Sequence, residues 1–402
     1  MTDASTQLGD DRPYLQRTQP LPRRLEEVTP AWLGEMLAHR YPGVVVHDFE
    51  TVEVKSSHTT KVRVRLDMND AGRAAGIPEH VCLKANWSGM RTPEICELEA
   101  RFYGLASSGL DVPVPAAYFA DWDDDGWGNG IVVMEDLARS PGTFGSSDDH
   151  LGVDAVAAGL ETLARVHGAM WGDPRLATWK WLHPNMGTAN DTEQVIIYWN
   201  YIWFNLTDPE YRAVVPAWVY DRPELMAHAL DALTAYERAA TGTHCLVHGD
   251  AHQGNSFLRA DGQRVWVDWQ LVRHGTALRD VEYFLVSSLT VEERRANDRA
   301  LVEHYRQSLL ATGAEGAPGA DEAWQQFIRW PAYGSQAWLG NINQWGQSSG
   351  VEMVKRHFAA LEDYDTVGVL TTGKAPSRPF VPGEGAYRLS RQLQQQLDER
   401  TR

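Results

Sequence analysis

The spacing of hydrophobic and polar positions changes along the chain and divides it into two parts. Between residues 44 and 66, apolar residues alternate with polar ones, and this period of two predicts two strands joined by the segment SSHTT. Thr29 and Pro30 precede an apolar stripe and suit a helix N-cap and first helical position, so a helix is expected to begin there. Further strands are predicted at 81–85, 118–120 and 131–134, with one helix at 93–107 between the third and fourth strands.

Beyond residue 135 the pattern takes the period of a helix. At 151–171 the apolar residues recur every three or four positions, which predicts an amphipathic helix. Other helices are predicted at 194–206, 223–240, 292–312, 320–345 and 351–363, and short strands at 245–247, 256–258 and 265–269. The predicted fold class is α+β, a small β-rich lobe followed by a larger, mainly helical lobe. The expected parts are a loosely ordered arm (1–28), the first lobe (29–135), the second lobe (136–371) and a polar tail (372–402).

Composition and charge narrow the class of protein. The chain has 402 residues, of which 43% are hydrophobic and 23% charged, as in ordinary globular proteins. Its net charge of −17 argues against nucleic acid or an anionic membrane as a partner, because binding phosphate requires a basic surface. No apolar run is long enough for a membrane span, and the polar N-terminus lacks a secretory signal pattern. The three widely spaced cysteines indicate reduced thiols, so a cytoplasmic protein is expected. The expected assembly is a monomer or a homodimer.

The segment 245–280, CLVHGDAHQGNSFLRADGQRVWVDWQLVRHGTALRD, carries the strongest chemical pattern. Asp250 stands in a glycine-bearing turn after a short apolar strand, Asn255 follows it, and Asp268 closes the strand VWVD. Phosphoryl transfer requires a carboxylate for the attacking hydroxyl and oxygen ligands for magnesium. The joint spacing makes Asp250 the candidate general base, and Asn255 and Asp268 the candidate Mg²⁺ ligands. A single Asp in a turn is more often a capping residue, so the interpretation depends on the whole set.

A lysine near the end of an apolar strand supplies the cation that such a site needs. Lys84 is interpreted as binding the nucleotide phosphates, held by a carboxylate from the following helix. Glu99 is the preferred partner, with Glu97 and Glu94 as alternatives on the same helix. The segment Met134-Glu135-Asp136-Leu137 is predicted to be the hinge whose backbone meets a purine edge. The alternative for the lysine is a strand-edge side chain in solvent.

These motifs resemble those of the aminoglycoside phosphotransferase and choline kinase superfamily of small-molecule kinases, and are most similar to its ecdysteroid-kinase-like branch. The resemblance spans residues 30–365 and rests on VCLKAN, ELEARFY, VVMEDLA, LARVHGAMW, LVHGDAHQGN and VWVDWQ, with FYGLASSG pointing to the branch. It implies a protein-kinase-like bilobal fold. It also implies transfer of the γ-phosphoryl group of ATP or GTP, with Mg²⁺, to a hydroxyl of a small molecule.

Two departures from the family pattern affect the interpretation. The loop that covers the phosphates usually contains glycine, but here it reads KSSHTT, where Ser57 and Thr59 are the candidates for binding phosphate. HGD stands in place of the protein-kinase HRD, and no APE-like segment follows, which favours a small-molecule acceptor over a protein. A catalytically silent kinase-fold protein that binds nucleotide or metabolite is the main alternative. A metal-dependent hydrolase using Asp250 and Asp268 is a third reading, which leaves Lys84 unexplained.

The acceptor is expected to bind among tryptophan-rich helices. The chain holds 16 tryptophans, and the segments 195–204 and 330–345 combine aromatic residues with an absence of carboxylates. This composition favours a fairly apolar or aromatic-recognised alcohol over an aminoglycoside, although core packing is the alternative for each tryptophan. Asp280 is predicted to cap a helix or brace the loop, and His167 to be a hydrogen-bonded core residue. The candidate substrate contacts are His252, His274, Trp199, Trp203 and Trp338.

Overall fold

The computed structural model describes residues 17, 19–56, 59–87, 94–107, 110–123, 128–147, 149–186, 202, 205–340 and 347–372, except for the side chains of 347–349. The chain divides into two compact units. Unit 1 consists of Met1–Phe144, Pro174–Leu182 and Ser256–Val272. Unit 2 consists of Gly145–Asp173, His183–Asn255 and Arg273–Arg402.

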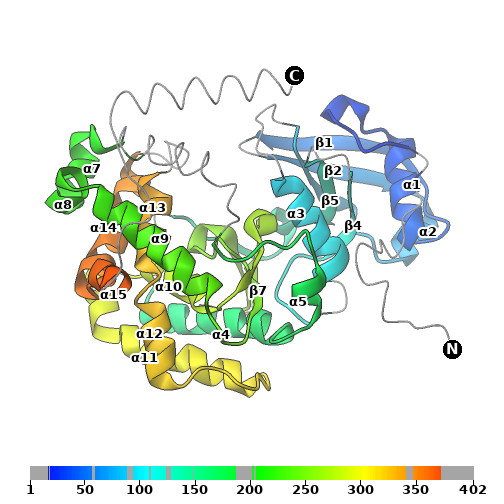
Figure 1. Cartoon of the computed structure of the whole chain (residues 1–402). Helices are drawn as coiled ribbons and strands as arrows, with labels where there is room; N and C mark the ends of the chain where they lie inside the picture. The colour runs from blue at the N-terminus through cyan, green and yellow to red at the C-terminus, as the bar shows by residue number, and fades with distance from the viewer. Residues whose placement is uncertain are drawn as a thin grey trace. The chain divides into compact units, whose positions relative to one another are not determined.

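Unit 1 is built on a five-stranded antiparallel sheet with the strand order β1-β2-β3-β5-β4 (Figure 1). Its strands are β1 Val46–Ser56, β2 Thr60–Met68, β3 His80–Ala85, β4 Ala117–Trp122 and β5 Gly130–Glu135. Its helices are η1 Leu25–Glu27, α1 Pro30–Arg40, α2 Asp70–Ala74, α3 Ile95–Arg101, the π-helix η2 Phe102–Ala106, η3 Leu137–Arg139, α5 Arg175–Thr178 and η6 Trp269–Leu271. The strands predicted from the alternating pattern are therefore all present.

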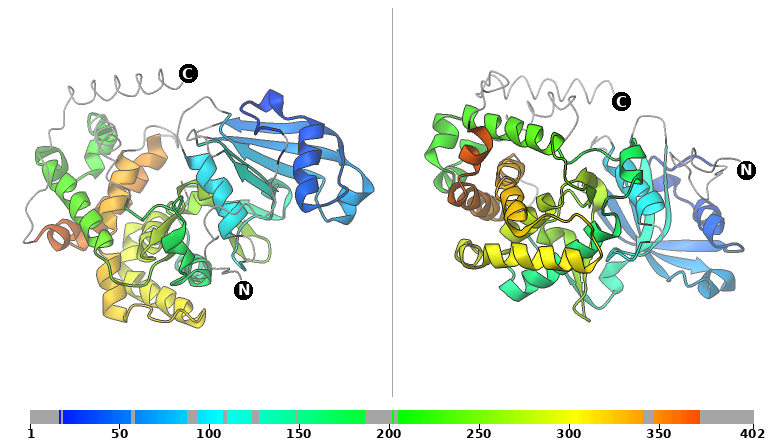
Figure 2. Two further views of the ribbon diagram at one scale, coloured as in Figure 1. Left: turned by 45° about the vertical axis from the view of Figure 1, so that its right-hand side comes forward. Right: turned by 60° about the horizontal axis from the view of Figure 1, so that its bottom comes forward.

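The two faces of this sheet carry different side chains, and α1 lies against one of them (Figure 2). One face packs with α1 in a core that includes Trp32, Leu33, Met36, Leu37, Val62, Val64, Leu66, Val81, Leu83, Ile131 and Val133. Because side chains alternate along a strand, the opposite face of β2 and β3 carries Lys61, Arg63, Cys82 and Lys84. The sheet thus presents cationic side chains on the face that α1 does not cover.

The local sequence predicts where α1 begins, but it does not predict some other parts of unit 1. The Thr29 hydroxyl accepts a hydrogen bond from the Trp32 amide at 3.1 Å, so α1 begins as predicted. The polar connection between β2 and β3 contains a short helix, α2, which was not predicted. The prediction of a loose arm over 1–28 is wrong for its described C-terminal part, because Leu21 and Val28 are buried in the core and Trp87 Nε1 donates to the carbonyl of Pro22 at 2.9 Å.

A second, three-stranded sheet with the order β6-β8-β9 also belongs to unit 1. Its strands are β6 Gly142–Phe144, β8 Ser256–Arg259 and β9 Arg264–Trp266. The strand predicted at 265–269 ends early, because Asp268 has a left-handed backbone (φ 68°) that is incompatible with a strand. A boundary at residue 135 alone is therefore too simple, since 136–144, 174–182 and 256–272 join the first unit.

Unit 2 is mainly helical. Its helices are α4 Val153–Ala169, α7 Pro209–Val214, α8 Ala217–Asp221, α9 Glu224–Arg238, η5 Gln253–Asn255, α10 Leu278–Ser288, α11 Val291–Ala311, α12 Ala320–Phe327, α13 Pro331–Leu339, α14 Gln347–Asp363 and α15 Thr366–Thr371. Its strands are β7 Cys245–Val247 and β10 Arg273–Gly275, which pair antiparallel. The longest of the described helices, α11, packs along α4 (Figure 1). Within the described residues, no helix has the length and apolar character needed to cross a membrane.

The helix predicted over 320–345 is interrupted. Residues 328–330 separate α12 from α13, and Pro331 occupies the first position of α13, where its missing N–H costs no helical hydrogen bond. Most of the helix predicted at 194–206 and the tail beyond residue 372 lie outside the described residues.

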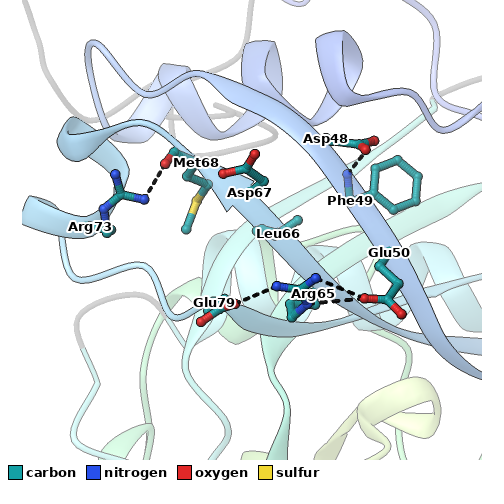
Figure 3. A pocket seen from close by; sticks show the side chains of 9 residues that line it. All are labelled: Asp48, Phe49, Glu50, Arg65, Leu66, Asp67, Met68, Arg73 and Glu79. Carbon is teal, nitrogen blue, oxygen red and sulfur yellow. Dashed lines mark hydrogen bonds and ion pairs between the residues drawn. The ribbon is translucent and has the colours of Figure 1, made fainter.

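A hollow of about 360 Å³ lies at β1, β2 and α2 (Figure 3). Arg65 crosses it and pairs with Glu50 and Glu79, each at 3.1 Å. None of the residues predicted to carry chemistry lines this hollow.

Candidate functional site

A buried ion-pair cluster in unit 1 is centred on Lys84. Its ammonium group lies 2.5 Å from Glu99 Oε2 and also contacts Asp268 Oδ1. The side chains of Lys84 and Glu99 are 4% and 2% exposed, so both charges are almost completely removed from water. The predicted pairing of Lys84 with Glu99, rather than with Glu97 or Glu94, is confirmed, and Glu97 instead pairs with Arg101 at 2.8 Å.

Electrostatics favour the charged forms of Lys84 and Asp268, whereas burial raises the pKa of Glu99 above its ordinary value. Burial alone would lower the pKa of Lys84, but the carboxylates of Asp268 and Glu99 raise it above its ordinary value. Burial would likewise raise the pKa of Asp268, yet Lys61 and Lys84 hold it well below its ordinary value. Isolated charges would be costly at such depth, so each of these groups depends on its partners.

Packing of α3 against η6 fixes the two carboxylates. The backbone N–H of Trp269 donates to Glu99 Oε1 at 3.2 Å, and the Trp269 ring stacks on Phe102 with centroids 3.9 Å apart. Asp268 precedes Trp269 in a left-handed conformation that turns the chain out of the strand direction. In the sequence VDW, Trp269 therefore holds the turn in place, and this turn determines the position of Asp268.

Lys61 is a member of the cluster that the sequence interpretation missed. It lies directly opposite Lys84 in the β2–β3 register, and its Nζ is 3.1 Å from Asp268 Oδ2. The alternating pattern of β2 does place Lys61 on the polar face of that strand. The sequence alone does not give the β2–β3 register, which places Lys61 and Lys84 side by side.

In unit 2, the turn after β7 holds Asp250 and Asn255 together. Asn255 Nδ2 donates to the backbone carbonyl of Asp250 at 3.0 Å and to its Oδ2 at 2.9 Å. Gly249 has φ of 82°, a value that glycine adopts without strain, and the Asp250 N–H donates to His248 Nδ1 at 3.3 Å. The Asp250 side chain is 19% exposed. Its carboxylate is thus held on one side and reachable by solvent on the other.

Asp280 braces this turn from α10. Its two carboxylate oxygens accept hydrogen bonds from the backbone N–H groups of His248 at 2.5 Å and Gly249 at 2.9 Å. Burial alone would raise the pKa of Asp280, but the hydrogen bond from His167 and the nearby positive groups hold it below its ordinary value. His167 is fully buried and also bonds the Tyr305 hydroxyl at 2.8 Å. The predicted structural roles of Asp280 and His167 are confirmed, with bracing of the loop as the role of Asp280.

The family is settled by comparison with known proteins. The model of the phosphotransferase enzyme family matches residues 60–319, which is more than half of the chain. The chain belongs to this family. The predicted superfamily and enzyme class are thereby confirmed, whereas membership of the ecdysteroid-kinase-like branch stays a prediction. A comparison with curated protein sequences gives no match.

Solved structures resemble the phosphotransferase at low identity. A macrolide 2'-phosphotransferase from Brachybacterium faecium is 18% identical, with 86% of this chain and 99% of that chain covered and a TM-score of 0.41. A choline/ethanolamine kinase family protein from Mesorhizobium loti is 14% identical, with 83% and 94% covered and a TM-score of 0.44. A choline kinase from Cryptosporidium parvum is 10% identical, with 81% and 92% covered and a TM-score of 0.49. At these identities the acceptors of those proteins say nothing about the acceptor of this phosphotransferase.

In the predicted hinge, the Glu135 side chain makes contacts within unit 1. The Glu135 carboxylate accepts hydrogen bonds from the Arg259 guanidinium group, at 2.9 and 2.7 Å, and from the Ser140 hydroxyl. Burial would raise the pKa of Glu135, but these partners hold it below its ordinary value. Leu137 is buried in a small cluster with Phe257. A role of Glu135 and Leu137 in nucleotide binding stays a prediction that concerns their backbone.

Apart from His274, which lies on β10, the other predicted site residues fall into three groups. Ser57, Trp199 and Trp203 lie outside the described residues. Thr59 is buried beside the start of β2. His252 and Trp338 pack edge-to-face at 5.3 Å, both 2% exposed, and His252 Nε2 lies 3.9 Å from Asp250 Oδ2. Their described contacts are with protein side chains, so substrate contact stays a prediction for them.

Each unit carries an oxygen donor of the kind that Mg²⁺ prefers. Asn255 uses Nδ2 for both bonds to Asp250, which leaves its amide oxygen unused by those bonds, and Asp268 supplies carboxylate oxygens. Hard oxygen ligands suit Mg²⁺, which is commonly held by one or two carboxylates together with substrate phosphates. The cysteines, which the structure leaves unpaired, offer no competing thiolate, because burial raises the pKa of Cys82 to about 11 and that of Cys96 to about 12.

Replacing Asp280 with asparagine is expected to destabilise the phosphotransferase by about 2–3 kcal/mol, because an amide NH₂ then faces one of the two backbone donors of the loop. Equilibrium unfolding in urea measures this loss. Asp154→Asn, at an exposed site in the first turn of α4, is the matched control and should change stability little. Equal stability of the two variants would contradict the bracing role.

A histidine on β10 should make stability depend on pH. Burial, and then the nearby His244 and His183, lower the pKa of His274 to about 4. The unfolded chain therefore binds a proton that the folded chain excludes between about pH 6.5 and 4, and stability should fall as pH decreases through that window. His274→Gln should reduce this slope in urea midpoints measured across the window, and an unchanged slope would contradict the assignment.

Proposed function

We propose that this phosphotransferase transfers the γ-phosphoryl group of ATP to a hydroxyl of a small, fairly apolar or aromatic-recognised metabolite or antibiotic. The observation that carries the proposal is the buried cluster of Lys84, Glu99 and Asp268. It combines a fixed ammonium group for phosphate with a carboxylate suited to a metal. A hydrolase that used Asp250 and Asp268 would not need Lys84. A catalytically silent protein would not need the hydrogen bond between Asn255 and Asp250.

The chemistry proceeds by a direct displacement at phosphorus. The acceptor hydroxyl donates a hydrogen bond to Asp250, whose carboxylate takes the proton as the hydroxyl oxygen bonds to the γ-phosphorus. The bond between that phosphorus and the oxygen it shares with the β-phosphate breaks, and ADP leaves. Asn255 keeps the Asp250 carboxylate oriented, and Lys84 places positive charge on the phosphates. When bound, Mg²⁺ would be held by Asn255 and Asp268 and would add positive charge to the phosphate oxygens.

Donor and acceptor are recognised by different parts of the chain. The Glu135 side chain is paired with Arg259. Residues 135–137 therefore contact the purine edge through their backbone groups. ATP is the proposed donor, with GTP as the alternative. The acceptor contacts the aromatic segments 195–204 and 330–345. These segments contain no carboxylate that would attract a polycationic aminoglycoside.

A screen of hydroxylated metabolites tests the proposal. Purified protein, Mg²⁺ and either ATP or GTP are incubated with pools of alcohols, and products are sought by mass spectrometry as a gain of one phosphoryl group. Transfer to at least one alcohol is expected, and it should disappear when the nucleotide is omitted. Nucleotide binding without transfer to any alcohol, or steady nucleotide hydrolysis that no alcohol diverts, would contradict it.

A further inference from the structure

Two lysines of unit 1 share one aspartate but differ in their surroundings. Lys84 contacts Asp268 and also Glu99, and its side chain is 4% exposed. Lys61 contacts Asp268 through Nζ at 3.1 Å, and its side chain is 41% exposed. Among the ion pairs of the described residues, Asp268 is the partner of Lys61. The buried lysine is thus fixed by two carboxylates, whereas the exposed one is held by a single contact at the surface.

The register of the sheet places Lys61 beside a second cation. Lys61 and Lys84 are directly opposite each other on β2 and β3, and like charges in that position repel. Asp268 lies against both ammonium groups and offsets the repulsion. The four side chains Lys61, Lys84, Glu99 and Asp268 sum to zero charge. An exposed ion pair such as that of Lys61 contributes little stability, so this lysine is the member that a competing ligand can release.

We propose that Lys61 is a second phosphate-binding lysine, which neutralises Asp268 until a magnesium nucleotide enters and then moves to the nucleotide phosphates. This inference rests on the proposed function. A metal ion at Asp268 repels the ammonium group of Lys61, while the arriving triphosphate offers that group new anionic partners. The long, partly exposed side chain provides the freedom for the exchange.

The sequence of the preceding loop gives Lys61 a reason to take this role. The segment KSSHTT contains no glycine, so it lacks the residue that lets a backbone approach phosphate most closely. Lys61 follows this segment directly and begins the polar face of β2. A side-chain cation at that position supplies phosphate contacts that a glycine-rich loop would make through backbone N–H groups.

Binding measurements on Lys61→Met test the proposal without relying on turnover. Titration calorimetry should show a Kd for ATP with Mg²⁺ about tenfold to a hundredfold above that of the wild type, the effect of losing a charge-assisted contact. The Kd for adenosine should stay the same, because adenosine has no phosphate. Mn²⁺ alone, titrated into nucleotide-free protein, should bind Lys61→Met more tightly, because Asp268 is then free of one competing cation.

Two further variants separate this role from general charge and from folding. Lys355→Met removes a lysine of α14 that pairs with Glu352 at 3.4 Å and is 53% exposed, and it should leave ATP affinity unchanged. Lys61→Arg keeps the charge and should retain most of the ATP affinity, even if Lys61→Met proves unstable in urea. An equal loss in Lys355→Met, an unchanged ATP affinity in Lys61→Met, or a Lys61→Arg protein that binds ATP as weakly as Lys61→Met overturns the proposal. Failure of wild-type protein to bind any nucleotide would instead contradict the proposed function.

Discussion

Asp250→Asn is expected to lower kcat for phosphoryl transfer by about 10²–10⁴-fold, the usual contribution of a positioned general base. The substitution keeps the shape of the side chain, and an asparagine oxygen can still accept the hydrogen bond from Asn255 Nδ2. What it removes is the ability to take a proton from the acceptor hydroxyl. Nucleotide affinity should change little, because Lys84 and Asp268 are untouched.

The measurement is steady-state formation of the phosphorylated product, with calorimetry to determine nucleotide Kd. Asp261→Asn is the matched control: this aspartate is exposed and accepts a turn hydrogen bond from the Gln263 N–H at 2.9 Å, and its replacement should leave kcat unchanged. If Asp250→Asn retained a turnover close to that of the wild type, another group would have to be the base. A wild-type protein that binds nucleotide yet never transfers phosphate would favour the silent alternative.

The parts of the fold that sequence reasoning predicted are those with strong local signals. The alternation along β1 and β2, and Thr29-Pro30 before α1, determine element type and starting point within a few residues. The short helix α2 has few apolar positions, and β10 has three residues, so neither produces a period long enough to recognise. Burial of Leu21 depends on contacts distant in sequence, which composition of the arm does not reveal.

The parts of the candidate site that could be predicted are those in which the local sequence position of a residue indicates its role. A lysine at the end of an apolar strand and a glutamate two turns into the next helix region pointed to the pair of Lys84 and Glu99. Lys61 was overlooked because its position depends on strand register, which a single sequence does not encode locally. The packing of His252 against Trp338 is likewise tertiary, and it explains why buried aromatic residues cannot be assigned to substrate from composition.

Asp268→Asn is expected to lower kcat/KM by about a thousandfold, because the loss of a carboxylate ligand to the metal removes several kcal/mol of transition-state stabilisation. Asparagine tolerates the left-handed backbone at this position (φ 68°), so the turn before Trp269 should persist. Nucleotide binding should lose its dependence on Mg²⁺, while binding of adenosine should remain. Asp250→Asn and Asp268→Asn would thus differ in metal dependence, although both lose transfer.

The same variant should change how stability responds to acid. Lys61 and Lys84 hold the pKa of Asp268 below its unfolded value of about 3.8, so the wild type gains stability from this carboxylate at higher pH and loses it as pH falls below about 4. Asp268→Asn carries no titratable group there, and the two lysines repel each other at every acidic pH. It should be less stable than the wild type at pH 7, and the difference should shrink as the pH is lowered in urea titrations. A constant difference across that range would show that Asp268 does not stabilise the protein as a charged partner of the lysines, whatever its role in metal binding.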